Sequence, residues 1–452
     1  MGILGRRYLH TLFSNLVLKF VVGLTISILI ARTLGPEGRG EYSLLVLIVT
    51  TVTTLFNFGI PSTNTYFTAK KKLNRVQLYR ASMVLAVVIS IVTFGVLYLL
   101  YDFKLFDKFL FPTDKLTPPI LASLGVIPIA FFNVFAQGII IGENKIELNN
   151  YMSLSSQGAL AFLLAVLYLF GALSVTSAIL LYAFSHVLAF AIIVGTSFPS
   201  LSDIVRTRIV WRDYMAMLRF SGTIHLGNLT QFFNYRLDSF IVNFFRGTAA
   251  VGLYGIAAIL GETLWLLSGS MASVLLPTIA GQHEKSKELT VKAAAATFAI
   301  SVLGGIVAFL AGPFLIVYLF GEKFSGSIEP FLILIPGVVI FSITNILATY
   351  LTGAGRPGYN AAIAFISFLF TVIFDILLIP RYSISGAAIA SGISYTMSTI
   401  MTVIAFARVS GVSFSESVAI VKSLSVDVRG IVTRMQQRLG FRDDPSGTTG
   451  TK

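Results

Sequence analysis

Apolar stretches of twenty residues or more dominate the chain, and short polar segments separate them. Runs of this length and composition are typical of helices that cross a lipid bilayer. The pattern predicts an all-α integral membrane protein with about twelve transmembrane helices. Their expected ranges are 12–33, 42–66, 78–101, 118–142, 151–170, 177–198, 215–245, 248–281, 291–320, 331–353, 358–379 and 384–407.

The composition agrees with a membrane protein and excludes several other classes. Hydrophobic residues make up 55% of the chain and charged residues only 12%, about half of the usual share in soluble domains. Cysteine is absent and only four histidines are present, so we expect no disulfide framework and no metal site. No phosphate-binding loop motif occurs, and we expect a protein that is neither an enzyme nor dependent on a cofactor.

The basic residues indicate how the chain is oriented in the membrane. Lys and Arg concentrate in the segments 70–80 and 206–212 and in the tail after Arg408, all on one side of the predicted topology. Arg39 is among the few basic residues expected in the loops on the other side. The positive-inside rule therefore predicts a multi-pass protein of the cytoplasmic membrane with both termini in the cytoplasm. This bias and an anionic substrate explain the net charge of +13 without nucleic acid.

Two similar segments indicate an internal duplication. "GPEGRGEY" begins at Gly35 and "GTAAVGLY" at Gly247, 212 residues later, and both read G-x4-G-x-Y. Six helices in each half is an even number, so both halves share one orientation around a central cavity. We expect an N-terminal lobe over 1–198, a linker over 199–213, a C-terminal lobe over 214–408 and a basic cytoplasmic tail over 409–452.

The predicted seventh helix carries most of the polar residues expected within the membrane. His225, Asn228 and Arg236 share one helical face, whereas Asp238 points about 200° away from Arg236. Arg236 and Asp238 are therefore not each other's direct partner. Arg236 either contacts an anion in a cavity or belongs to a structural ion pair. Asp238 is a structural anchor held by Lys19 or a backbone amide, or else a coupling site.

Other polar residues within the apolar segments are further candidates for a site. Asn15 and Lys19 share a face of the predicted first helix, and Lys19 either enters the cavity or extends to the membrane surface. Arg219, at the start of the seventh helix, joins the candidates for substrate binding. Glu262 and Asp375 are buried carboxylates that either pair with arginine or couple transport to an ion.

Several motifs in the order found here are similar to one known family. They are "LIARTLGPEGRGEYSLL", "NFGIP", "NYRLDSFIVNFFRGTAAVGLYGIAAIL" and "LLIPRYSISGAAIASGISY". Together they resemble the polysaccharide-export branch of the multidrug/oligosaccharidyl-lipid/polysaccharide (MOP) superfamily, the O-antigen flippase (Wzx) type. The resemblance runs from about Leu12 to Arg408. Asp375 departs from this pattern, because relatives often have a neutral Asn there.

The resemblance implies both a fold and a function. It implies two pseudo-symmetric six-helix lobes, related to multidrug and toxic compound extrusion (MATE) transporters, around a cavity that opens alternately to each side. It implies transport of a polyprenyl-diphosphate-linked oligosaccharide for lipopolysaccharide or another polysaccharide, with membrane lipids, a polymerase and glycosyltransferases as partners. Basic residues in the cavity, here Arg236, would hold the diphosphate.

Three other functions stay open. A MATE-type cation or drug antiporter would need a carboxylate in the cavity, and Asp238 is the candidate. A flippase for lipid II would share the fold, although such proteins usually carry two further helices. A non-transporting scaffold in a glycan assembly complex would give the buried charges no purpose.

Overall fold

The computed structural model describes residues 3–102, 117–207, 211–281, 283–413 and 415–422. Within this part the chain is helical, as predicted. The helices are α1 (Ile3–Phe56), α2 (Ile60–Ala69), α3 (Arg75–Asp102), α5 (Pro118–Gly125), α6 (Ile127–Gly142), α7 (Ile146–Leu169), α8 (Val175–Thr196), α9 (Leu201–Arg206), α10 (Trp211–Arg246), α11 (Thr248–Glu262), α12 (Trp265–Gly281), α13 (His283–Phe320), the 3-10 helix η1 (Glu322–Ser327), α14 (Ile328–Gly353) and α15 (Pro357–Ser410).

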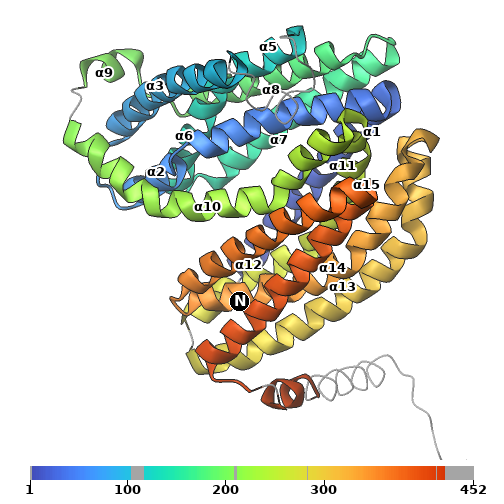
Figure 1. Ribbon diagram of the computed structural model, residues 1–452. Helices are drawn as coiled ribbons and strands as arrows, with labels where there is room; N and C mark the ends of the chain where they lie inside the picture. The colour runs from blue at the N-terminus through green and yellow to red at the C-terminus, as the bar shows by residue number, and fades with distance from the viewer. Residues whose placement is uncertain (1–2, 103–116, 208–210, 282, 414, 423–452) are drawn as a thin grey trace, which may run out of the picture.

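The helices form two lobes (Figure 1). Helices α1 to α9 make up one lobe, and α12 to α15 make up the other, with α10 and α11 running where the lobes meet. The second half of α1 packs along α11, and α10 packs along α15. Elements from both halves of the sequence therefore line the boundary between the lobes.

Eight helices of the described chain are long and apolar enough to cross a membrane. Two of them, α1 and α15, each contain two segments joined at a break, at Gly35 (φ 67°) and at Ser383 (φ 55°). The polar helix α10 and the pair α11 and α12 supply the remaining segments. The predicted membrane fold of about twelve spanning segments in two lobes is thus confirmed.

Three of the predicted helices are divided in the structure. The helix expected over 42–66 breaks at Phe58 and Gly59, both with positive φ, and α2 begins just after them. The helix expected over 118–142 divides between α5 and α6, where proline occupies the first turn of the second piece. The helix expected over 248–281 divides between α11 and α12. Apolar runs do not reveal such breaks, because both pieces remain hydrophobic.

The ends of the second half also differ from the expectation. The linker expected over 199–213 contains the short helix α9, and α10 begins at Trp211. In the tail, the structure describes a helix over residues 415–422, and residues 423–452 lie outside the described part.

Large apolar side chains cover the outside of the lobes. Ile91 of α3 is 66% exposed, Leu310 of α13 is 73% exposed, and Leu169 at the end of α7 is 80% exposed. A soluble protein rarely exposes many such residues together. These surfaces suit contact with lipid, and the polar residues between the lobes become the features to explain.

Candidate functional site

A cavity of about 360 Å³ lies between the two lobes. Both segments of α1 line it on one side, and α10 and α11, which run where the lobes meet, line it on the other side. Its described polar lining comes from three serines, one threonine, one tyrosine and two arginines, with no carboxylate among them. These residues are Ser27, Arg39, Tyr42, Ser43, Thr50, Arg236 and Ser239.

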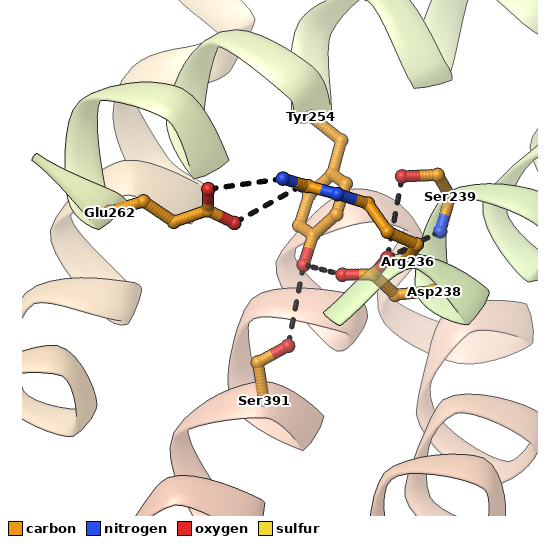
Figure 2. Close-up of polar contacts among 6 residues, drawn as sticks. All are labelled: Arg236, Asp238, Ser239, Tyr254, Glu262 and Ser391. Carbon is orange, nitrogen blue, oxygen red and sulfur yellow. Dashed lines mark hydrogen bonds and ion pairs between the residues drawn. The ribbon is translucent and has the colours of Figure 1, made fainter. Parts of the chain in front are cut away.

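Arg236 lines this cavity and also forms an ion pair. Its Nη1 and Nη2 donate to Oε1 and Oε2 of Glu262 at 3.2 and 3.4 Å, as Figure 2 shows. The pair joins the C-terminal half of α10 to the end of α11. The ion pair expected as one alternative for Arg236 is therefore present, with Glu262 rather than Asp238 as the counter-charge, and contact with an anion stays a prediction.

Asp238 is buried and is held by three donors. The Tyr254 hydroxyl donates to Oδ2 at 2.6 Å, and the Ser239 amide and hydroxyl donate to Oδ1 at 2.6 and 3.3 Å. Ser391 of α15 lies 3.3 Å from the same Tyr254 hydroxyl (Figure 2). The backbone amide expected as a partner is present. Lys19 is not a partner in the described contacts, because its Nζ donates to Asn150 of α7 at 3.3 Å.

Arg39 lines the cavity, although the pattern of the sequence predicts it in an outside loop. Its side chain is only 3% exposed. Nη1 donates to the Gly252 carbonyl at 2.6 Å and Nη2 to Ser27 Oγ at 3.2 Å, while Nε has no partner in the part of the chain that the structure describes. Gly35 and Pro36 before it make the sequence resemble an exposed turn. In the structure, this segment instead continues α1 as a helix, and the side chain of Arg39 is buried.

The other candidates on α10 do not join the cavity lining in the described part of the chain. His225 is buried, and its ring Nε2 lies 2.9 Å from the Leu55 carbonyl at the end of α1. Asn228 and Arg219 are exposed. Of the three residues expected on one face of α10, only Arg236 therefore belongs to the described cavity lining. Asn15 lies in α1, but its side chain is outside the described part.

Asp375 of α15 is the most deeply buried carboxylate described. Its side chain is 0% exposed, and neither carboxylate oxygen has a hydrogen-bond partner among the described residues. Asp238 is close enough to Asp375 for the two carboxylates to interact electrostatically. Burying an unpaired carboxylate costs several kcal/mol. A proton or a bound cation would remove that cost.

Comparison with known proteins assigns the chain to a family. A family model described as "Polysaccharide biosynthesis protein" matches residues 9–283, more than half of the chain. The chain belongs to this polysaccharide biosynthesis protein family. This confirms the resemblance to polysaccharide transporters of the MOP superfamily at the level of family.

Two relatives from archaea extend the comparison. A probable low-salt glycan biosynthesis flippase of Haloferax volcanii, Agl15, is 22% identical over 42% of this chain and 42% of its own length. An uncharacterized membrane protein of Methanocaldococcus jannaschii, MJ1375, is 24% identical over 89% of this chain and 97% of its own length. The chain thus spans less than half of the flippase relative that it matches.

Solved structures show the same fold. An inward-facing MATE family transporter of the MOP superfamily superposes with a TM-score of 0.74, at 16% identity over 87% of this chain and 95% of that chain. The lipid II flippase MurJ in an inward closed conformation superposes with a TM-score of 0.73, at 14% identity over 96% and 94%. The polysaccharide biosynthesis protein described here therefore has the two-lobe architecture of the MOP superfamily.

Proposed function

We propose that this protein is a flippase that moves a polyprenyl-diphosphate-linked oligosaccharide from the inner to the outer leaflet by alternating access. The observation that carries the proposal is the cavity between the lobes. Two guanidinium groups line it, and its described lining contains no carboxylate. The family assignment and the flippase relative support a glycan-linked substrate.

The chemistry of the cavity suits a diphosphate headgroup. Arginine presents a planar fork of donors that matches phosphate oxygens two at a time. Serine hydroxyls from both lobes, at Ser43 and Ser239, add neutral donors. The lobes would hold the headgroup between them while the polyprenyl chain stays in lipid.

The membrane potential can help to drive this transport. A diphosphate carries about two negative charges, and an inside-negative potential assists export by about 2.3 kcal/mol per charge per 100 mV. Asp375 and Asp238 provide carboxylates in the C-terminal half of the chain for coupling transport to an ion. We propose that Asp375 holds a proton or a monovalent cation, because its buried oxygens have no other partner. Glu262 serves instead as the counter-charge of Arg236.

The cavity also weighs against a cation or drug antiporter. Such a substrate requires a carboxylate in the cavity, but Asp238 directs its oxygens to Tyr254 and Ser239. A lipid II flippase would use the same cavity chemistry, so only the glycan attached to the diphosphate distinguishes it. A scaffold without transport would leave the buried charges unexplained.

Transport by the purified protein tests the proposal. The protein is reconstituted in vesicles with a fluorescent polyprenyl-diphosphate disaccharide, and the fraction accessible to a membrane-impermeant quencher is followed with time. We expect faster exchange between leaflets than in protein-free vesicles, and no efflux of a cationic dye. Dye efflux without lipid exchange would favour the antiporter, and neither activity would favour the scaffold.

A further inference from the structure

The two copies of the internal repeat contact each other across the lobe boundary. A Cβ atom added to Gly40 would lie 1.8 Å from the Thr248 carbonyl oxygen, and one added to Gly252 would lie 1.9 Å from the Pro36 carbonyl oxygen. The same 212-residue offset relates Gly40 to Gly252 and Pro36 to Thr248. The contact is therefore pseudo-two-fold, and we call these four residues the glycine clasp.

Arg39 forms a hydrogen bond across the glycine clasp. It lies beside Gly40 in α1 and donates to the carbonyl of Gly252 in α11 at 2.6 Å. Its guanidinium is buried, and its described hydrogen-bond partners are a neutral carbonyl and a neutral hydroxyl. Among the described ion pairs none involves Arg39. A buried charge without a counter-charge is costly and favours an anionic ligand.

Of the two arginines that line the cavity, Arg39 is the one whose charge has no described counter-charge. Glu262 is the counter-charge of Arg236, whereas the Nε atom of Arg39 has no hydrogen-bond partner within the described segments. An anion in the cavity therefore gains most from Arg39. Hydrogen bonds from a cation to an anion are about twice as strong as those to neutral acceptors. An anion can consequently replace the Gly252 carbonyl as the acceptor.

We infer that Arg39 is an anion-sensitive latch, which holds the glycine clasp closed until an anionic headgroup in the cavity takes its hydrogen bonds. The inference rests on the proposed function, because it assigns the latch to the same headgroup. The latch gives the transport cycle an order. The substrate first enters the cavity from the side opposite the clasp, and its negative charge then releases the contact between Gly40 and Gly252. The empty protein stays closed at the clasp.

Spin labels on either side of the clasp test the latch. Glu37 and Ala249 are exposed, lie one on each repeat copy and are related by the same offset. The chain contains no cysteine, so Glu37→Cys and Ala249→Cys create the only two labelling sites. The distance between the labels is measured by double electron–electron resonance in nanodiscs, with and without inorganic pyrophosphate at constant ionic strength. We expect pyrophosphate to raise the ratio of open to closed clasps by about fivefold or more.

Substitutions of Arg39 separate its charge from its hydrogen bond. Arg39→Gln keeps a donor for the Gly252 carbonyl but removes the charge, so the clasp stays closed and no longer responds to pyrophosphate. Arg39→Ala removes both, so the clasp opens without pyrophosphate. Arg39→Lys keeps the charge and one donor and retains a response. Arg32→Gln is the matched control, because Arg32 also joins the lobes, through the Leu319 carbonyl at 2.7 Å, but is exposed and outside the cavity lining.

Three results would overturn the latch. They are a native clasp that does not respond to pyrophosphate, an Arg39→Gln clasp that responds as the native one does, and an Arg39→Ala clasp that stays as closed as the native one. Size-exclusion profiles and helical circular dichroism confirm that each variant is folded, and Arg39→Gln and Arg39→Lys decide the question if Arg39→Ala is not. Pyrophosphate carries neither lipid nor sugar, so a negative result leaves glycan transport standing. Failure of the transport assay alone, with a clasp that still responds to pyrophosphate, would leave the anion response of Arg39 standing and remove only its assignment to a lipid headgroup.

Discussion

Arg236 of α10 and Glu262 of α11 face each other beside the cavity, with Nη1 3.2 Å from Oε1 and Nη2 3.4 Å from Oε2. The pair is partly open, because the two side chains are 43% and 25% exposed. A pair of this kind is accessible to a ligand that competes for the guanidinium. Substitution of both residues can therefore distinguish two roles of Arg236, as a substrate contact and as one half of a structural pair.

Arg236→Ala is expected to lower lipid exchange between leaflets by about tenfold or more, since hydrogen bonds to charged groups contribute about 1.5–3 kcal/mol each. The variant also leaves Glu262 without its counter-charge. The double variant Arg236→Ala with Glu262→Gln removes both charges and is expected to restore folded yield but not exchange. Recovery of exchange in the double variant would show that the pair is only structural.

Gly40→Val is expected to hold the lobes apart, because even its Cβ atom would overlap the Thr248 carbonyl. The readout is the labelling rate of a single cysteine in the cavity, Ser43→Cys, by a water-soluble maleimide. We expect faster labelling in the presence of Gly40→Val. Gly95→Ala in α3 is the matched control, because nothing lies within 4 Å of its added Cβ. Unchanged labelling with Gly40→Val would mean that the clasp does not close the cavity.

The helices were predictable from the sequence because each apolar segment must satisfy its backbone hydrogen bonds internally within lipid. Helical spacing also correctly separated Arg236 from Asp238. Their true partners were not predictable, because Glu262 and Tyr254 come from α11 and meet α10 only through tertiary packing. Arg39 was misplaced because a glycine- and proline-rich segment usually marks an exposed turn. Here the glycines instead permit the close approach of two backbones.

The two buried aspartates are expected to respond differently to the same substitution. Asp238→Asn weakens an acceptor of three hydrogen bonds, so thermal stability and folded yield should fall, by about 1–3 kcal/mol in the free energy of unfolding. Asp375→Asn removes an unpartnered charge, so stability should stay equal or rise.

Cation binding at Asp375 is measured through the melting temperature of the purified protein. Sodium or protons that bind the folded state stabilise it, so the native melting temperature should depend on one of them. We expect Asp375→Asn to lose that dependence. Equal dependence in the native protein and in Asp375→Asn would place the cation elsewhere.

Lys19→Ala is expected to have a small effect on lipid exchange, of about twofold or less. Lys19 donates a single long hydrogen bond to Asn150, at 3.3 Å, and it is outside the described cavity lining. A hydrogen bond from a charged group contributes about 1.5–3 kcal/mol at its usual length, so the loss of this long one should affect stability more than exchange. A loss of exchange as large as that of Arg236→Ala, at equal folded yield, would instead make Lys19 a substrate contact.

The central claim is that the cavity arginines hold a diphosphate while the lipid crosses the membrane. The most direct test compares the initial rates at which one disaccharide is flipped on a polyprenyl diphosphate and on the matching monophosphate. The native protein should prefer the diphosphate by about tenfold, the equivalent of one charged hydrogen bond. The double variant Arg236→Ala with Glu262→Gln should have a smaller preference, because Arg39 still lines the cavity. Equal rates on both lipids in the native protein, or an undiminished preference in the variant, would contradict the account.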